Sequence, residues 1–188
     1  MQILKIILLT LILSLIAISL TSYAYAQNYE DTYVILETTQ GEIVIEFFFL
    51  DAPDHVKNFL VLSKDGFYDG TLFHRIIPGF MIQGGDPNTK TDNKASWGMG
   101  GPGYNIKAEF SSRSHLRGIV SMARSQDPNS AGSQFYIVTS DSAFLDREYT
   151  VFGQVKEGMD VADKIVNAKR DGNDCPLEKI TMIKVSLE

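Results

Sequence analysis

The chain has 188 residues, of which 44% are hydrophobic and 21% are charged, and its formal net charge is -6. This composition is typical of a folded globular protein, and the acidic charge balance argues against binding to the phosphate backbone of nucleic acids. The lone cysteine, Cys175, excludes a disulfide within the chain and argues against a thiolate metal site. We therefore expect no metal and no nucleic-acid partner.

The first 26 residues differ in composition from the rest. Lys5 precedes an almost unbroken apolar run over residues 6–20, and the segment ends in Ala-Tyr-Ala, a small-x-small cleavage pattern. This order is typical of a secretory signal peptide. The alternative is an uncleaved membrane anchor, because residues 6–26 approach the roughly 20 apolar residues that a membrane span needs. Both interpretations place residues 27–188, the length of one domain, outside the cytoplasm: secreted, periplasm-like or at the cell surface.

Two strands are expected at the start of this domain, over residues 33–37 and 41–47. In the second segment, Glu and Val alternate with Ile43, Ile45 and Phe47, which is typical of a half-buried strand.

A helix is expected next. Asp51 would be its N-cap and Pro53 would lie in its first turn, Val56 and Phe59 have helical spacing, and Gly66 would end it.

Short strands dominate the remaining sequence. They are expected over residues 71–77, 80–83, 118–123, 134–138, 151–155 and 180–187. Met159, Ala162, Ile165 and Val166 indicate a second amphipathic helix. Many short strands with two helices predict a mainly β fold, a closed antiparallel barrel capped at its ends.

Residues 73–86 (FHRIIPGFMIQGGD) are the most informative segment. Arg75 and Gln83 share one parity, so on strands their side chains would point to one face, and Pro78-Gly79 would kink the run or turn it back as a hairpin. The result is an apolar surface that carries a guanidinium and an amide but no metal-ligand set and no nucleophile–base pair. Such a surface suits holding an apolar group and polarising the bond beside it, rather than hydrolysis.

Several blocks of this sequence, in this order and spacing, resemble the cyclophilin family of peptidyl-prolyl cis–trans isomerases. They are residues 73–86, 121–124 (SMAR), 132–137 (GSQFYI), 144–146 (FLD) and 151–153 (VFG), within a resemblance that covers residues 33–188. The resemblance implies a closed eight-stranded antiparallel β-barrel capped by two α-helices, without a cofactor. It also implies an outer groove that binds proline-containing segments of unfolded or flexible proteins.

The same resemblance implies the roles of individual residues. Arg75 matches the catalytic arginine; from its chemistry, Gln83 is expected either to hold Arg75 in place or to bond the substrate backbone. The positions that bind substrate match Phe80, Met81, Ala123, Arg124, Gln134, Tyr136, Phe144, Leu145 and Tyr149. Arg124 stands where many members have an asparagine whose main chain receives the peptide, so this change need not weaken binding.

The chemistry of arginine agrees with the role that the resemblance implies for Arg75. Rotation about an X–Pro bond must break amide resonance, against a barrier of ~18–20 kcal/mol. In the twisted transition state the imide nitrogen regains a lone pair, and a donor aimed at it stabilises that state and not the planar ground state. A guanidinium is always charged and does not act as a base, so no proton transfer is needed.

Two other functions are weighed against catalysis of this kind. One is a non-catalytic proline-peptide-binding or chaperone module on the same fold, which an intact Arg75 and Gln83 argue against. The other is a phosphoryl enzyme that uses His74, Arg75 and Asp86, which the missing metal set and basic channel argue against. His55 and His115 are interpreted as solvated side chains.

The sequence departs from the family pattern at three pocket positions. Tyr136 replaces a frequent phenylalanine and brings a hydroxyl that needs a partner or water. Tyr149 stands where many eukaryotic members have histidine, and Phe144 where many have tryptophan, so we expect weaker binding of cyclosporin-type inhibitors. Residues 86–104 form a longer segment than in compact members and are expected to wall one end of the groove. The sequence thus predicts a monomeric isomerase that assists the folding of secreted or cell-surface proteins.

Overall fold

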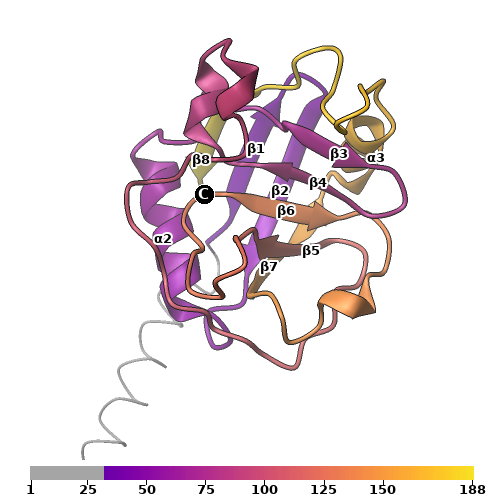
Figure 1. Ribbon diagram of the computed structural model, residues 1–188. Coiled ribbons are helices and arrows are strands. Elements are labelled where there is room, and N and C mark those ends of the chain that lie inside the picture. The colour runs from indigo at the N-terminus through magenta and orange to yellow at the C-terminus, as the bar shows by residue number, and fades with distance from the viewer. Residues whose placement is uncertain (1–31) are drawn as a thin grey trace, which may run out of the picture. The chain divides into compact units, whose positions relative to one another are not determined.

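Eight short strands of the computed structural model, which describes residues 32–188, form one curled antiparallel sheet (Figure 1). The strands are β1 (Val34–Thr38), β2 (Gly41–Phe47), β3 (Arg75–Ile77), β4 (Met81–Gly84), β5 (Ile119–Met122), β6 (Phe135–Val138), β7 (Val151–Glu157) and β8 (Met182–Leu187). Their order in the sheet is β3-β4-β6-β5-β7-β2-β1-β8. The expected mainly β fold with eight strands and two helices is therefore confirmed. The predicted signal peptide or anchor, residues 1–26, lies outside the described residues.

The barrel is less closed than expected, because β3 and β8 remain the two ends of the strand order and do not pair with each other. Main-chain bonds nevertheless join the segments next to these two strands. The N–H of Gly70 donates to the carbonyl of Met182, the N–H of Met182 donates to Thr71, and the N–H of Phe73 donates to Ile180, at 2.8, 2.8 and 2.9 Å. The sheet is thus a half-barrel whose open side is bridged by a few hydrogen bonds.

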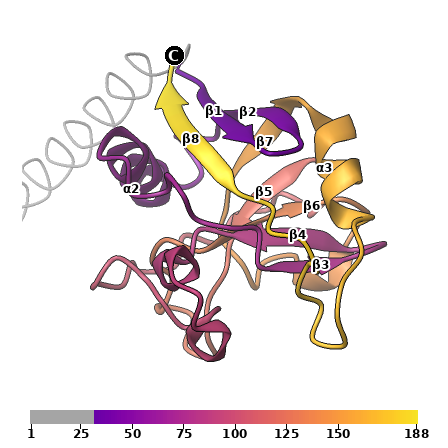
Figure 2. The same cartoon turned by 90° about the horizontal axis from the view of Figure 1, so that it is seen from above.

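Both expected helices are present, α2 over Pro53–Lys64 and α3 over Met159–Val166. They lie on opposite sides of the curled sheet (Figures 1 and 2). Three short 3-10 helices, η1 (Pro87–Lys90), η2 (Lys94–Ser96) and η3 (Ala143–Leu145), lie in the connections. No helix within residues 32–188 is long and apolar enough to cross a membrane.

An aromatic cluster around Phe59 of α2 forms the centre of the core. The Phe59 ring centroid lies 5.0 Å from that of Tyr68 and 5.2 Å from those of Phe135 and Phe152. All four side chains are completely buried. Such aromatic pairs contribute about 0.5–1.5 kcal/mol each beyond their burial, so the cluster fixes α2 against the sheet.

The N-terminus of α2 is capped differently from the prediction. Asp51 is not the N-cap: this position belongs to Ala52, which provides no side-chain bond. The carboxylate of Glu109 instead accepts hydrogen bonds from the main-chain N–H groups of Asp54, at 3.2 Å, and His55, at 3.0 Å. A residue 55 positions away from Asp54 thus satisfies the free donors of the first turn.

The chain turns back as a hairpin between the two expected strands 71–77 and 80–83. This is one of the two alternatives, a kink or a hairpin, that the sequence left open at Pro78-Gly79. The N–H of Phe80 donates to the carbonyl of Ile77 at 3.0 Å, and Gly79 has a φ of 74°. Proline followed by a glycine with positive φ is the pattern of a type II turn. The first strand is shorter than expected, because residues 71–74 lie outside β3.

Candidate functional site

One row of side chains crosses four neighbouring strands of the sheet. The register pairs Arg75 of β3 with Gln83 of β4, Gln83 with Tyr136 of β6, and Tyr136 with Ser121 of β5. Paired residues on adjacent strands project to the same face, and neighbours along a strand project to opposite faces. Since Phe135 points into the aromatic core, this row lies on the face turned away from that core.

A cavity of about 270 Å³ lies over this face. It is lined by Arg75, Phe80, Met81, Gln83, Ala123, Arg124, Tyr136, Phe144, Leu145 and Tyr149. The structure therefore brings ten of the eleven residues chosen from the sequence to one place, and Gln134 lies in the adjoining pocket. Their roles in binding and catalysis stay a prediction.

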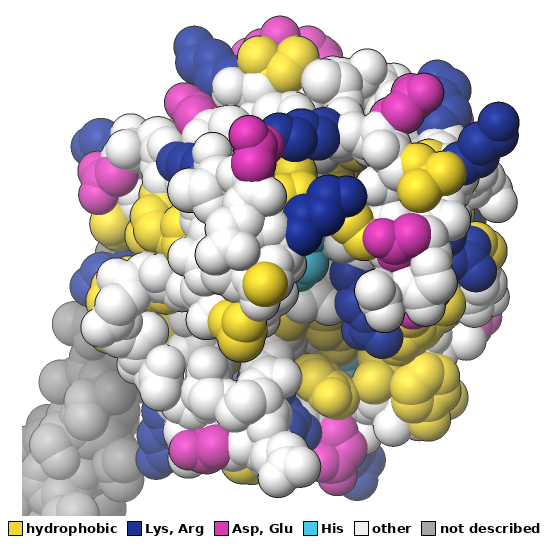
Figure 3. Space-filling view, turned by 45° about the horizontal axis from the view of Figure 1, so that its top comes forward, with side chains coloured by type: hydrophobic (Ala, Val, Ile, Leu, Met, Phe, Trp, Pro, Cys, Tyr) yellow, Lys and Arg dark blue, Asp and Glu magenta, His cyan; other side chains and the backbone are white. Residues whose placement is uncertain are grey.

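The cavity has a buried apolar floor and an exposed aromatic rim. Met81, Tyr136 and Leu145 are only 2%, 5% and 7% exposed, whereas Phe144 is 72% exposed. The ring of Phe144 lies 5.3 Å from that of Phe80, centroid to centroid. This shape can enclose a small apolar ring while the rest of a ligand stays outside. Figure 3 shows a hollowed face on which hydrophobic side chains gather near both basic and acidic groups, without a continuous basic stripe.

Arg75 and Gln83 carry the polar groups at this apolar floor. The exposed guanidinium of Arg75 makes no hydrogen bond and no ion pair within residues 32–188, so all its donors remain available. Gln83 donates from Nε2 to Oε1 of Gln134 at 3.0 Å. Gln83 makes no hydrogen bond to Arg75. Of its two expected roles, only that of bonding the substrate backbone therefore remains.

Arg124 holds two loops together at the mouth of the cavity. Its guanidinium carbon lies 4.4 Å from the centre of the Tyr149 ring. The guanidinium donates to the main-chain carbonyls of Ser125, at 2.8 Å, and Glu148, at 2.9 Å. With only 12% of its side chain exposed, Arg124 contributes a fixed wall rather than a mobile charge.

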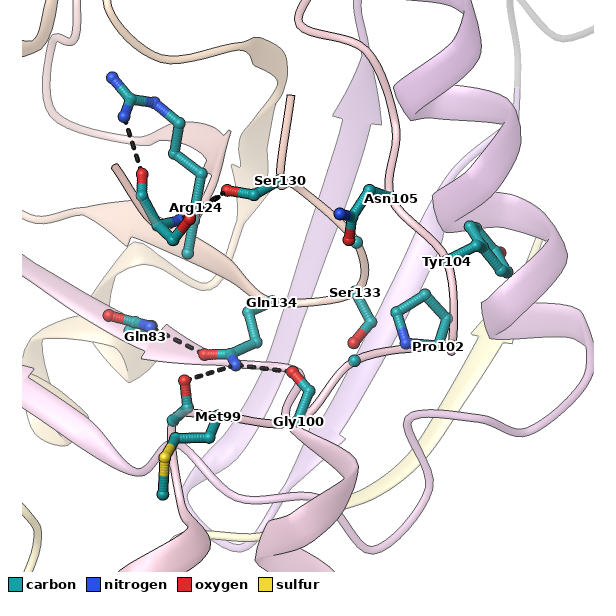
Figure 4. Close-up of a pocket in the computed structure, with 16 residues that line it drawn as sticks. Gln83, Met99, Gly100, Pro102, Tyr104, Asn105, Arg124, Ser130, Ser133 and Gln134 are labelled. Atoms are coloured by element: carbon teal, nitrogen blue, oxygen red, sulfur yellow. Dashed lines mark hydrogen bonds between the residues drawn. The ribbon is translucent and has the colours of Figure 1, made fainter. Parts of the chain in front are cut away.

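A larger pocket, of about 660 Å³, adjoins this cavity and shares Gln83, Ala123 and Arg124 with it (Figure 4). Residues 98–105 line it on one side, in agreement with the wall expected from the segment 86–104. Gln134 joins the two pockets, because its Nε2 donates to the carbonyls of Gly98, at 2.9 Å, and Gly100, at 2.8 Å.

Asp86 anchors the same wall from behind. Its carboxylate is completely buried and accepts hydrogen bonds from the main-chain N–H groups of Asn88 and Gly98. A Cβ added at Gly100 would collide with the carboxylate of Asp86 and with Asn88, so glycine is required there. Asp86 is thus structural, and no group of three His, Cys, Asp or Glu side chains in the described part of the chain could hold a metal.

The hydroxyl of Tyr136 lies at the floor of the smaller cavity. It is buried and has no hydrogen-bond partner among residues 32–188. Burial raises the pKa of Tyr136 well above its ordinary value, so the hydroxyl keeps its proton. Within residues 32–188 the hydroxyl thus lacks the partner that the sequence led us to expect.

The interpretation of His55 and His115 as solvated side chains was wrong, because both are completely buried. His55 Nδ1 lies 2.6 Å from a carboxylate oxygen of Glu109, and His115 Nδ1 lies 3.0 Å from one of Asp146. Both partners are distant in sequence, and the polar segment around His115 has no apolar periodicity. Nothing in the local pattern could have revealed this burial.

Known proteins share this fold and sequence. The family described as "Cyclophilin type peptidyl-prolyl cis-trans isomerase/CLD" matches residues 33–187. A peptidyl-prolyl cis–trans isomerase of Synechococcus elongatus is 46% identical over 142 residues, which cover 76% of this chain and 91% of that protein. One of Dictyostelium discoideum is 44% identical over 158 residues, or 81% of this chain and 96% of that protein.

The solved structure of a cyclophilin-type isomerase from Cryptosporidium parvum, determined in the presence of the dipeptide Ala-Pro, is also similar. It has a TM-score of 0.76 at 34% identity, covering 83% of this chain and 98% of that one. The cavity on the β3–β4–β6 face, the eight-stranded sheet and these matches lead to one conclusion: the chain belongs to the cyclophilin family of peptidyl-prolyl cis–trans isomerases.

Proposed function

We propose that this isomerase acts on X–Pro bonds in unfolded or flexible proteins outside the cytoplasm, and thereby assists the folding of secreted or cell-surface proteins. The observation that carries the assignment of the site is the unpartnered guanidinium of Arg75 beside an apolar cavity of about 270 Å³. The Ala-Pro dipeptide used with the Cryptosporidium relative supports a proline-containing ligand for this cavity.

The floor of the cavity would hold the proline ring. Met81, Tyr136 and Leu145 present apolar surface there, and burial of such surface contributes roughly 25 cal/mol per Å². With the ring held, the chain before the proline can rotate against it. Restricting one side of the bond in this way removes part of the entropy cost of reaching the twisted state.

Arg75 would lower the barrier electrostatically. In the planar ground state the nitrogen lone pair is delocalised into the carbonyl and accepts no hydrogen bond, whereas in the twisted state it is localised. A guanidinium N–H aimed at that nitrogen is therefore a stronger partner in the transition state than in the ground state, as acceleration requires.

Gln83 and the larger pocket would position the peptide. One N–H of Gln83 is fixed by Gln134, which orients the amide and leaves its oxygen and second N–H for the substrate main chain. Residues of the peptide beyond the proline site would pass Ala123 and Arg124, the walls that both pockets share.

Isomerisation of a proline tetrapeptide by the wild type, Arg75→Ala and Arg75→Lys tests this assignment. Loss of the donor should lower kcat/KM by about 10²–10³-fold, as for other preorganised donors, and lysine should recover little because it lacks the planar fork. Arg170→Ala, in a surface ion pair with Asp174, is the control and should retain full activity. Full activity of Arg75→Ala would refute the mechanism. A wild type that binds the peptide without accelerating it would favour the non-catalytic binding module.

The location outside the cytoplasm rests on the pattern of residues 1–26. Intact-mass analysis of the protein isolated from its native cells, with fractionation, tests it. A chain beginning at Gln27 in the exported fraction supports a cleaved signal peptide, and a full-length chain in the membrane fraction supports an anchor. A full-length chain in the cytoplasmic fraction would contradict the proposal.

A further inference from the structure

His115 is fixed to both ends of η3, the short helix that carries Phe144 and Leu145. Its carbonyl accepts a hydrogen bond from the main-chain N–H of Ser142, just before η3, at 2.8 Å. Its main-chain N–H donates to Oδ1 of Asp146, just after η3, at 2.7 Å, and its Nδ1 lies 3.0 Å from the same oxygen. One buried residue thus brackets the helix that supplies a floor and a rim residue of the proline cavity.

The imidazole of His115 also contacts two further walls of that cavity. It stacks on the ring of Tyr136, with centroids 6.2 Å apart and planes inclined by 16°. It meets the ring of Tyr149 edge to face at 6.5 Å. Its Nε2 lies 3.2 Å from Oγ of Ser121, the last member of the side-chain row that begins at Arg75. The rings of Tyr136 and Tyr149 line the cavity, and Ser121 belongs to the row of side chains that leads to Arg75.

The two ring nitrogens of His115 face one carboxylate and one hydroxyl, those of Asp146 and Ser121. With its proton on Nδ1, directed at Asp146, Nε2 can accept the hydroxyl proton of Ser121. The hydroxyl of Ser121 can equally donate to the carbonyl of Thr150, 2.8 Å away, whose second lone pair is free beside the one that accepts the N–H of Met122 at 3.0 Å. A second proton on the ring removes the first of these two arrangements, so Ser121 then donates to Thr150 and accepts from Nε2.

The charges that face the ring act in opposite directions. Burial lowers the pKa of His115, whereas the carboxylate of Asp146 raises it, and burial prevails. The rings of Tyr136 and Tyr149 also face the imidazole, and the guanidinium of Arg124 lies on the ring of Tyr149. His115 is therefore neutral in its folded environment at neutral pH.

We propose that His115 is a positioning residue of the isomerase site, which holds Leu145 and Tyr136 in the arrangement that grips the proline ring. The inference rests on the proposed function of this cavity and assigns a role to a residue that does not line it. Protonation of the imidazole disturbs its contacts with Ser121 and Tyr136, so kcat/KM should fall as the pH drops below the ordinary histidine pKa of about 6.5.

His55 provides a matched control for the test. It is equally buried, its Nδ1 and main-chain N–H also bond one carboxylate, that of Glu109, and it does not line the cavity. We would compare His115→Asn and His55→Asn with the wild type. Asparagine can keep a donor near the position of Nδ1 but removes the imidazole ring.

Exchange spectroscopy by NMR on an Ala-Pro peptide measures the isomerase rate without a coupling protease, from pH 5 to 8. His115→Asn should lose about 10-fold or more in kcat/KM at pH 7.5, in line with the cost of small misplacements at a site, and should lose the acidic inflection. His55→Asn should lose comparable stability in urea but keep activity within about 2-fold. Because His74 is also buried beside Arg75, the diagnostic result is the loss of the inflection in His115→Asn.

Two results would overturn the proposal: an inflection and rate that persist in His115→Asn, or an equal loss of activity in His55→Asn. If His115→Asn does not fold, NMR spectra of the wild type recorded over the same pH range still test the proposal. The methyl signals of Leu145 and the ring signals of Tyr136 should shift together with the titration of His115, and signals that stay constant would contradict the coupling. A wild type without isomerase activity, in contrast, would contradict the proposed function itself.

Discussion

Arg75 and Gln83 are direct partners across the antiparallel ladder of β3 and β4, and their side chains share one face. Gln83 continues this connection through Gln134 to the carbonyls of Gly98 and Gly100. The wall of the larger pocket is therefore joined by consecutive hydrogen bonds to the partner of the proposed catalytic arginine. A substitution in that wall should therefore alter isomerase activity by changing the position of Gln83.

Gln134→Ala removes the donor that both glycine carbonyls share and frees the Gln83 amide. We expect KM to rise about 3- to 10-fold for a hexapeptide that reaches the larger pocket, and much less for Ala-Pro, since each lost hydrogen bond costs about 0.5–1.5 kcal/mol. Gln154→Ala, which loses a side-chain bond to Glu46 on another part of the sheet, is the control. Equal effects on both peptides would contradict the role of the wall.

Arg124→Met keeps the aliphatic stem but loses the bonds to the three carbonyls of Ser125, Gln126 and Glu148 and the contact with Tyr149. The free energy of unfolding should fall by about 1–2 kcal/mol and KM should rise, because Tyr149 is no longer held. Arg124→Lys should not restore either value, since lysine lacks the planar fork. Arg113, whose guanidinium carbon lies 3.6 Å from the centre of the Phe48 ring, gives a matched control in Arg113→Met. If both methionine variants change KM equally, Tyr149 is not positioned by Arg124.

Glu109→Gln tests the distant cap of α2. Burial alone would raise the pKa of Glu109, but hydrogen bonds from His55 and Asp54 outweigh it and the pKa is lowered. The unfolded state therefore binds this proton more readily, and the stability that the carboxylate contributes near neutral pH is lost as the pH falls below about 4.3. Urea unfolding should show a deficit of about 1–2 kcal/mol for the variant at pH 7 that shrinks at pH 3.5. Glu157→Gln, at the exposed end of β7, should show no such deficit.

Phe144→Trp tests the rim of the proline cavity. The indole adds an N–H donor at a side chain that is 72% exposed, so cyclosporin-type inhibitors should bind up to about 10-fold more tightly, the value of one hydrogen bond. Inhibition constants of the wild type, Phe144→Trp and Phe144→Tyr measure this. Inhibition of the wild type at nanomolar inhibitor would show that the missing donor is unimportant.

Much of the fold could be predicted because its determinants are local. Alternation around Ile43 and Ile45, the Pro78-Gly79 turn and the helical spacing after Met159 each act within a few residues. The prediction of the α2 cap was wrong for the opposite reason. Glu109 comes from a distant loop, so Asp51 was the only candidate near the start of the helix.

The lining of the smaller cavity was accessible from the sequence because its residues lie in recognisable blocks. Of the larger pocket, the sequence indicated only a wall from the segment 86–104, because the bonds from Gln134 to the carbonyls of Gly98 and Gly100 join distant segments. The burial of His115 also escaped, because its partners Asp146 and Ser121 lie on other segments. Periodicity reveals which face of an element is buried, but it cannot reveal which loop covers a polar residue.

The position of β1 between β2 and β8 has a consequence for how this enzyme is made. A chain synthesised from its N-terminus forms β1 early, yet the second edge of that strand stays unpaired until residues 182–187 have emerged. An open edge is a template for pairing with other chains, and closure over so long a separation is slow. During its own synthesis the isomerase is therefore as vulnerable to aggregation as the proteins whose folding we propose it assists, and its last strand ends that vulnerability.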